Sequence, residues 1–421
     1  MKILQIHKYF SKENGGGSVT AFFETIQLLR KRGHEVVVFS MEDEKNDPSE
    51  YSKFFAEHFD INKAKGFWEK IKLIPGVVWN HEAQTKLEKL LEVEKPDVAH
   101  VHNIYHYLTP AILHTLKKHK IPIVFKLSDY KVICPNYKLF INGDVCEKCK
   151  GHKYYNCFFN VCLKKSYLSS FIGMIEAYVH WMKGSYKKID YFLAPSEFMK
   201  EKCVDFGIKE DRIKILRNVI NTENFNLEQD FIEEDYILSL GRVSEEKGID
   251  YLILAFKEFV DEYPEIKTNL MIIGRGPQRD ALKDLARKLG ILDARVIFPG
   301  FIRGEKRDDL IRKSKGVVIS SIWYDNSPLV ISEAQLLGKP VIVSDRGGSK
   351  EMILENESGF IYLAQSVEEL KKVIIKFLAL SPEKRKEMGI KGKENILKIN
   401  SEEEYYLKLM DFYQQAIDGN E

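Results

Sequence analysis

Short apolar runs rich in β-branched residues alternate with helix-period patterns over almost the whole chain. Polar or glycine-containing stretches bound these runs, as is typical of strands in a parallel sheet. The predicted strands lie at residues 3–6, 36–39, 98–101, 121–127, 191–194, 213–216, 236–240, 270–273, 296–298, 317–320 and 341–343. This alternation predicts an α/β fold with helices on both faces of mostly parallel sheets.

The segments between the strands carry apolar residues at helical spacing. We expect Ser18 to cap a first helix that ends at Gly33, with basic residues in its last turn, where cations suit the helix dipole. Further helices are expected at residues 249–263, 278–289, 329–337 and 402–417. The last of these has no strand after it, so it either caps the second domain or crosses back to the first.

A polar, acidic stretch at residues 221–235 interrupts the pattern and is the best linker candidate. The 421 residues allow two or three domains. We predict two tandem, doubly wound, Rossmann-like domains. The first spans residues 1–220, with a Cys-rich insertion at 134–162, and the second spans residues 221–400. Residues 401–421 form the final helix.

The overall charge excludes a simple nucleic-acid binder, because 64 basic and 62 acidic residues leave a net charge of only +2. Residues 101–200 differ, since 15 lysines, no arginine and six acidic residues give that segment +9. We expect this segment to face an anionic partner.

No apolar run reaches the roughly 18 residues that a membrane span needs. The first residues, MKILQIHKYF, are too short and too polar for a signal peptide and form the first predicted strand. A cytoplasmic protein is therefore expected. Six cysteines in a large cytoplasmic chain argue against a disulfide framework.

Four of these cysteines have the spacing of a metal site. They are Cys146, Cys149, Cys157 and Cys162, and they follow Cys134. A leading C-x-x-C and four thiolates fit a tetrahedral structural zinc ion. Two alternatives remain open, namely a cluster of buried free thiols and disulfides formed where the protein meets oxidant.

A glycine run, Gly15, Gly16 and Gly17, follows the first strand and opens the first helix. Glycines let a ligand approach the backbone closely, and a helix N-terminus offers free N–H groups to an anion. The run is not G-x-G-x-x-G, and no acidic residue ends the second strand, so the sequence does not predict a dinucleotide site. An ordinary flexible loop is the alternative.

Two further loops are expected at the carboxyl ends of strands in the second domain, where ligands of open α/β sheets bind. The first, GRVSEEKG, places Arg242 and Lys247 five residues apart, which suits convergence on one diphosphate. The second, GRGP, begins at Gly274 and suits a close backbone approach to a nucleotide or sugar. Two solvated cations and a tight turn are the respective alternatives.

Two carboxylates lie eight residues apart in DNSPLVISE. Asp325 is expected in a loop near a sugar, and Glu333 two turns inside a helix suits the two hydroxyls of a ribose. His102 ends the strand at residues 98–101 and is expected to reach the loop edge, where it donates to a substrate hydroxyl or acts near a reacting carbon. A satisfied core histidine is the alternative.

With these motifs in place, the sequence resembles the retaining GT-B glycosyltransferases of family 4, also called group 1 glycosyltransferases. The resemblance covers nearly the whole chain and rests on the glycine run, His102, the GRVSEEKG and GRGP loops, the carboxylate pair, and Gly347-Gly348 with Glu351. The stretch HVHNIYHYLTPAIL and the Cys cluster resemble a subgroup that builds surface polysaccharides.

The resemblance implies two domains facing a central cleft and a C-terminal helix that crosses back to the first domain. It implies a nucleoside diphosphate sugar donor, UDP or GDP, bound mainly by the second domain, with the acceptor on the first. Arg242 and Lys247 would clamp the diphosphate without a metal cofactor. Glu333 would bind the ribose, His102 would lie near the reacting sugar, and Ile302, beside Phe301, would read the base edge. The remaining donor-binding positions are Gly16, Gly17, Gly274, Asn326 and Ser327.

The chain departs from the family pattern at two positions. Asp325 stands where the carboxylate pair usually begins with Glu, and Ser128 stands where many relatives have His. The leading prediction is a glycosyltransferase acting on a hydroxyl of a glycan or lipid-linked acceptor, with His102 and Asp325 at the reacting sugar. A nucleotide-sugar epimerase and a non-catalytic binding subunit are the alternatives.

One stretch also suits a membrane surface. Leu168, Phe171, Ile172, Ile175, Val179 and Met182 recur at three- and four-residue steps within residues 164–188, which begin and end with lysines. Residues 63–79 add Phe67, Trp68 and Trp79 beside further lysines. Such a surface favours peripheral contact with an anionic membrane. The alternative is that the stripe packs against the first domain's sheet.

Overall fold

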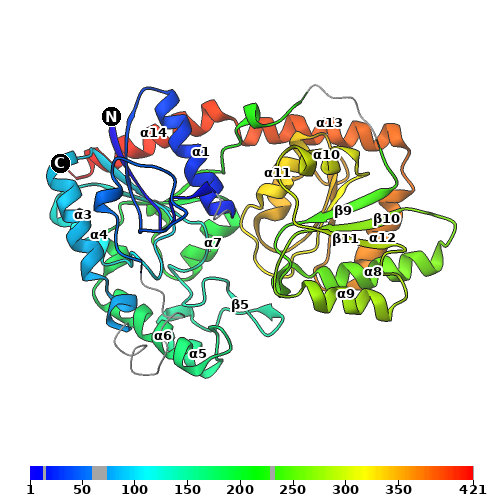
Figure 1. Ribbon diagram of the computed structural model, residues 1–421, viewed down its shortest axis with the longest axis horizontal. Helices are drawn as coiled ribbons and strands as arrows, with labels where there is room; N and C mark the ends of the chain where they lie inside the picture. Colours follow the sequence, from blue (N-terminus) through cyan, green and yellow to red (C-terminus); the bar gives the residue numbers. More distant parts are fainter. Residues whose placement is uncertain (13–15, 59–73, 228–232, 421) are drawn as a thin grey trace. The chain divides into compact units, whose positions relative to one another are not determined.

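The computed structural model describes residues 1–12, 16–58, 74–227 and 233–420. The chain divides into two compact units (Figure 1). Unit 1 comprises Met1–Leu139, Cys146–Val219 and Glu402–Glu421, and unit 2 comprises Phe140–Val145 and Ile220–Ser401. Gly15, Phe67 and Trp68, which the sequence singled out, lie outside the described residues.

Unit 1 is built on a six-stranded sheet in which all neighbouring strands are parallel. In spatial order the strands are β2 (Glu35–Phe39), β1 (Lys2–Ile6), β3 (Val98–Val101), β4 (Ile123–Lys126), β7 (Tyr191–Ala194) and β8 (Ile213–Ile215). The chain order reverses at β1, which lies between β2 and β3. Such a reversal opens a crevice at the carboxyl ends of the central strands.

The helices of unit 1 are α1 (Gly17–Lys31), α3 (His81–Glu94), α4 (Ile112–Lys118), α5 (Tyr155–Phe159), α6 (Tyr167–Met182), α7 (Glu197–Asp205) and α14 (Glu402–Asp418). The expected N-cap of the first helix is wrong. Helix α1 begins at Gly17 after Gly16, without a side-chain cap, and Ser18 lies inside its first turn.

The final helix α14 packs on unit 1, so the second of the two positions expected for it is right. The hydroxyl of Tyr413 lies 2.7 Å from Nδ1 of His100 in β3. The hydroxyl of Tyr405 lies 2.9 Å from Oγ1 of Thr25 in α1. These buried polar contacts fix the helix over the central strands, because a buried hydroxyl needs a partner.

Unit 2 also has a six-stranded parallel sheet. In spatial order its strands are β11 (Val296–Gly300), β10 (Asn269–Ile273), β9 (Tyr236–Leu240), β12 (Val317–Ile319), β13 (Val341–Ser344) and β14 (Gly359–Tyr362). Its helices are α8 (Ile249–Glu262), α9 (Arg279–Lys288), α10 (Glu305–Lys313), α11 (Leu329–Leu336), α12 (Val367–Leu378) and α13 (Pro382–Ile399).

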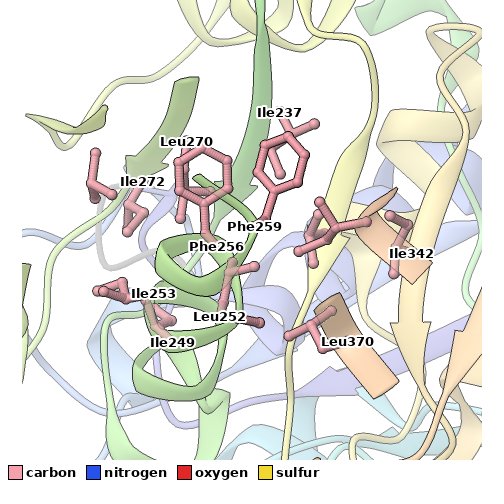
Figure 2. Packing of buried hydrophobic residues seen from close by; sticks show 14 of the residues in the cluster. Ile237, Ile249, Leu252, Ile253, Phe256, Phe259, Leu270, Ile272, Ile342 and Leu370 are labelled. Carbon is pink, nitrogen blue, oxygen red and sulfur yellow. The ribbon is translucent and has the colours of Figure 1, made fainter. Parts of the chain in front are cut away.

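Buried apolar residues cover both faces of this sheet, as the uninterrupted strand patterns predict. On one face, Phe256 and Phe259 of α8 pack with Leu270 and Ile272 of β10 and with Leu370 of α12 (Figure 2). On the other face, a second cluster joins strands β9, β12 and β13 to α11 and α13.

Three short strands lie outside the predicted set. They are β14 and the antiparallel hairpin of β5 (Phe140–Ile141) and β6 (Asp144–Val145). The hairpin interrupts the Cys-rich stretch and is grouped with unit 2. In the described part of the chain, no helix combines the length and apolar character that a membrane crossing requires.

Candidate active site

The donor residues predicted in the second domain lie along one edge of the unit 2 sheet. Arg242 and Lys247 follow β9, Gly274 follows β10, Ile302 follows β11, and Asp325, Asn326 and Ser327 follow β12. Glu333 lies inside α11, which starts just after that last loop. This is the carboxyl edge of the sheet, and the chain order reverses at β9, where ligands of such sheets bind.

The loops after β9 and β10 touch each other backbone to backbone. The amide of Val243 donates to the carbonyl of Arg275 at 3.0 Å. A Cβ on Gly274 would lie 1.9 Å from the carbonyl oxygen of Gly241, and one on Gly276 would lie 2.0 Å from that of Val243. The glycines are therefore needed to hold the loop that carries Arg242 in place.

Lys247 and Asp325 form an ion pair within this edge. The hydroxyl of Ser321 donates to the same carboxylate at 3.0 Å. The backbone of Asp325 is fixed as well, because the amide of Gly348 donates to its carbonyl at 2.7 Å. A Cβ on Gly347 would lie 2.2 Å from that carbonyl oxygen, so the turn after β13 supports the Asp325 loop closely.

Arg242 differs from Lys247 in its surroundings. Its side chain is exposed, and it makes no ion pair with any residue in the described ranges. A guanidinium held at the mouth of a glycine-bounded loop offers a fork of N–H donors to a phosphate. The two cations therefore differ in their surroundings, because Lys247 is paired with a carboxylate while Arg242 is exposed and has no ion-pair partner in the described ranges.

Glu333 is held by Arg307 of α10, a residue that sequence reasoning missed. Nη1 of Arg307 lies 3.1 Å from Oε1 of Glu333, and the same guanidinium lies 2.7 Å from Asp308. Burial raises the pKa of Glu333 above its ordinary value, and Arg307 opposes that shift. Arg307 therefore favours the ionised carboxylate, the form that accepts hydrogen bonds from sugar hydroxyls.

The segment after β11 presents an aromatic ring beside Ile302. Ile302 packs partly buried against the second core cluster. The ring of Phe301 is 48% exposed, and the guanidinium groups of Arg275 and Arg303 lie 4.6 and 4.7 Å from its centre. The surface next to Ile302 is therefore flat and cationic.

In unit 1, the structure places the glycine positions as expected and His102 differently. Gly16 and Gly17 stand at the N-terminus of α1. His102 is 1% exposed, its Nε2 lies 2.9 Å from Oε1 of Gln5, and its ring stacks on His100 at 4.2 Å. Burial lowers the pKa of His102 well below its ordinary value, so the ring is neutral.

The difference at His102 has a structural reason. Its amide donates to the carbonyl of Ile6, so the hydrogen bonding between β1 and β3 continues one residue past the end of β3. The side chain consequently points beside His100 and under Phe22 of α1, whose ring centre lies 5.1 Å away. His102 is therefore a core residue in this structure, and its action near a reacting sugar stays a prediction.

A polar group at the carboxyl edge of the unit 1 sheet was not assigned any role from the sequence. The loops after β1 and β3 meet where the amide of Lys8 donates to the carbonyl of Asn103 at 2.9 Å. Asp129, after β4, accepts from Nδ2 of Asn103 at 3.1 Å and from the amide of Lys131 at 2.9 Å. Their positions just after strand ends could have indicated a site from the sequence, because ligands of such sheets bind at that edge.

The pKa values of the two charged residues in this group, Lys8 and Asp129, are both shifted. Burial lowers the pKa of Lys8 to about 8, and the neighbouring Asp129 opposes the shift. Burial raises the pKa of Asp129. A carboxylate and an amine held together at a strand edge can bind hydroxyl groups as acceptor and donor, and perturbed pKa values mark candidate functional sites.

The cysteines of the Cys-rich stretch do not form a recognisable ligand set. Within the described residues, no group of three or more His, Cys, Asp or Glu side chains is arranged to hold a metal ion. Burial raises the pKa of Cys134 to about 11 and also raises that of Cys149. A hydrogen bond with Cys162 raises the pKa of Cys157 and lowers that of Cys162. Zinc at Cys146, Cys149, Cys157 and Cys162 is not supported by this geometry and stays a prediction.

The fold and the edge of unit 2 define the class. The two parallel six-stranded sheets, the second with the predicted donor residues at its carboxyl edge, are those of the GT-B fold. The model of "Glycosyl transferases group 1" matches residues 222–395, and that of "Glycosyltransferase Family 4" matches residues 15–127. The chain belongs to the group 1, family 4 glycosyltransferases.

Individual relatives agree with this family. An uncharacterized glycosyltransferase of Methanocaldococcus jannaschii is 31% identical over 43% of this chain and 49% of its own length. The alpha-monoglucosyldiacylglycerol synthase of Streptococcus pneumoniae is 26% identical over 61% of this chain and 63% of its own length. The chain thus spans about half to two thirds of these relatives.

Solved structures agree on the fold over the whole chain. The sucrose-phosphate synthase of Thermosynechococcus elongatus is 17% identical with a TM-score of 0.70, and each chain is covered to 99%. The Anabaena protein HepE, solved with UDP and glucose, is 16% identical with a TM-score of 0.67, covering 99% of this chain and 100% of HepE.

Proposed function

We propose that the chain is a retaining glycosyltransferase that moves a sugar from a nucleoside diphosphate to a hydroxyl of a glycan or lipid-linked acceptor in surface-polysaccharide assembly. One observation carries the proposal. The predicted diphosphate residues Arg242 and Lys247 and the predicted ribose residue Glu333 lie at one edge of one sheet, although they come from two separate segments. The family membership favours the same activity.

The proposed chemistry begins at the diphosphate. As the bond between the sugar's anomeric carbon and the diphosphate oxygen breaks, negative charge develops on the leaving group. Arg242 and Lys247 stabilise that charge, which is the part a metal ion plays in other phosphate sites, so transfer requires no metal cofactor. Asp325 holds Lys247 in position before the donor arrives.

The new glycosidic bond forms on the face from which the diphosphate leaves. The acceptor oxygen attacks the anomeric carbon, and a leaving phosphate oxygen takes the acceptor's proton. The configuration at that carbon is thereby retained, and no side chain needs to act as nucleophile. Glu333, whose ionised form Arg307 favours, orients the donor through its ribose hydroxyls.

Two statements about partners complete the proposal. UDP is the favoured donor nucleotide, because the Anabaena protein of the same fold was solved with UDP and with UDP-glucose; GDP is the second candidate. The acceptor binds in unit 1 at the group formed by Lys8, Asn103 and Asp129, and the reaction takes place in the cytoplasm or at the cytoplasmic membrane face.

The proposal is tested in two stages. A thermal-shift panel of UDP-, GDP- and ADP-sugars identifies the donor, because a ligand of the folded state raises the melting temperature. Release of nucleoside diphosphate is then measured with and without lipid-linked glycan extracts. Release that depends on an acceptor, with an anomerically retained product by NMR, supports a transferase. Conversion of the donor sugar without acceptor indicates an epimerase, and donor binding without turnover indicates a binding subunit.

A further inference from the structure

Helix α6 has its polar and apolar faces reversed relative to an ordinary surface helix. Its buried residues are Ser170, Gly173, Glu176 and His180. None of the six apolar residues of the predicted stripe, from Leu168 to Met182, is buried. The stripe therefore does not pack into the core of unit 1, and that alternative is wrong.

Specific polar contacts hold the helix in this orientation. The Glu176 carboxylate lies 2.7 Å from Nζ of Lys131 and 3.1 Å from Nδ1 of His106. His180 lies 3.0 Å from Oγ of Ser185. Gly173 allows close packing, since a Cβ there would lie 2.3 Å from Leu163. A buried carboxylate must be paired, so the inner face cannot rotate outward without losing these partners.

The outer face of α5 and α6 consequently presents a concentrated apolar surface. Of the sixteen large hydrophobic side chains exposed in the described residues, seven lie between residues 155 and 182. Phe159, Met182 and Tyr167 are 71%, 69% and 64% exposed. Tyr167, Phe171 and Met182 recur at helical spacing on one face of α6. Helix α5 lies beside α6 (Figure 1), and its Phe158 packs against Tyr167 and Phe171.

Lysines surround this surface. Exposed lysines lie before α5, between α5 and α6, and after α6, namely Lys148, Lys150, Lys153, Lys164, Lys165, Lys183 and Lys187. The two acidic residues between Cys146 and Lys188 are both paired with lysines: Glu147 with Lys202, and Glu176 with Lys131. The surface is thus basic, which disfavours pairing with a second copy of itself and favours an anionic partner.

We propose that the outer face of α5 and α6 docks on an anionic lipid bilayer. The aromatic and methionine side chains enter the interfacial layer, and the lysines contact the headgroups. The same helix is tied to the edge of the unit 1 sheet, because Lys131 pairs with Glu176 while its amide donates to Asp129. Docking therefore brings that edge to the membrane surface. The proposal does not depend on the transferase activity, since lipid binding needs no donor.

The test is co-sedimentation of the full chain with vesicles of phosphatidylcholine alone or mixed equally with phosphatidylglycerol. We expect binding to the anionic vesicles to be at least about tenfold tighter, and to weaken as salt rises past about 0.1 M. The variant Phe159→Ser/Met182→Ser should lose most of the binding. Its matched control is Leu363→Ser/Leu407→Ser, which removes side chains that are equally exposed elsewhere.

A charge variant keeps the proposal falsifiable if the apolar variant folds poorly. Lys153→Glu/Lys165→Glu changes only exposed positions of this surface, and Lys267→Glu/Lys288→Glu is its control. We expect the first to reduce anionic-vesicle binding about tenfold and the second to leave it unchanged. Equal binding to both vesicle types at low salt would overturn the proposal, as would unchanged binding by both surface variants. A dimer in solution that the apolar variant dissociates would instead assign the surface to a second copy of the chain.

Discussion

Arg307 and Glu333 form an ion pair at 3.1 Å although they lie 26 residues apart on different helices. Burial and Arg307 act on the pKa of Glu333 in opposite directions, and burial raises it. Because the proposed ribose contact requires the carboxylate, the affinity of the site for a donor depends on this pair.

We therefore expect Arg307→Gln to raise the pKa of Glu333 further. Donor affinity should then fall at a higher pH than in the unaltered protein as the solution is acidified. The measurement is the donor dissociation constant by calorimetry between about pH 5 and pH 8. The control is Arg287→Gln, which changes an exposed arginine of α9 that pairs with Asp284 instead of Glu333. An unchanged pH profile for Arg307→Gln would remove Glu333 from the donor site.

Removing either cation of the proposed diphosphate site should lower turnover, but the two variants should differ in stability. Arg242→Ala and Lys247→Ala should each lower turnover by about two orders of magnitude, since one preorganised charge stabiliser contributes about 3 kcal/mol. Lys247→Ala should also lower the free energy of unfolding, because it leaves Asp325 without its cation. Arg242 is exposed and unpaired in the described part of the chain, so Arg242→Ala should unfold like the unaltered protein. Near-normal turnover in both variants would contradict the assignment.

The backbone contact at Gly274 makes a stability prediction. Gly274→Ala should destabilise unit 2 by about 1–3 kcal/mol, because the new Cβ would overlap the carbonyl of Gly241. It should also weaken donor binding by displacing the Arg242 loop. Gly33→Ala is the matched control, since an alanine at its φ of +81° would be strained but no atom lies within 4 Å of the added carbon. If Gly274→Ala and Gly33→Ala lower the free energy of unfolding in urea by the same amount, backbone strain alone accounts for the effect at Gly274.

The buried Lys131–Glu176 pair predicts how unit 1 responds to acid. Burial alone would raise the pKa of Glu176, but Lys131 and His106 outweigh it and hold the pKa below the ordinary value. The stabilisation is therefore present above the unfolded-state value near pH 4.3 and is lost as the pH falls below it. Glu176→Gln should cost about 3–5 kcal/mol at neutral pH and flatten this acid dependence in denaturant unfolding. Glu368→Gln, in an exposed pair, should change neither.

The zinc hypothesis has a direct check. Zinc held by Cys146, Cys149, Cys157 and Cys162 would appear as about one zinc per purified chain, and a chelator would lower the melting temperature. Protein prepared without chelator that contains no zinc, and in which six thiols react after denaturation, would contradict the hypothesis and favour free cysteines. Disulfides would appear as fewer than six thiols after denaturation.

The sequence by itself determined most of the strands, the division into two sheets and the strand-end positions of the predicted donor residues. Parallel strands buried on both faces require continuous apolar runs, so their ends are visible locally. Arg242 and Gly274 follow such ends within two residues, and Asp325 lies in the loop after another. The short strand β14 and the start of α1 were not predicted correctly, because β14 has only four residues and α1 begins at Gly17 without any side-chain cap.

The tertiary structure alone decided which of these residues meet and which way they face. Lys247 and Asp325 pair across 78 residues, and no local pattern encodes that contact. His102 was expected at a loop edge, yet its backbone hydrogen bond to Ile6 keeps it in the sheet, and its side chain lies in the core. The apolar stripe of α6 was visible in the sequence, but the direction in which it faces was not. Glu176 and His180 face inward because their polar partners, Lys131 and Ser185, lie inside unit 1. Leaving a buried charge of this pair without its partner costs more than exposing apolar side chains.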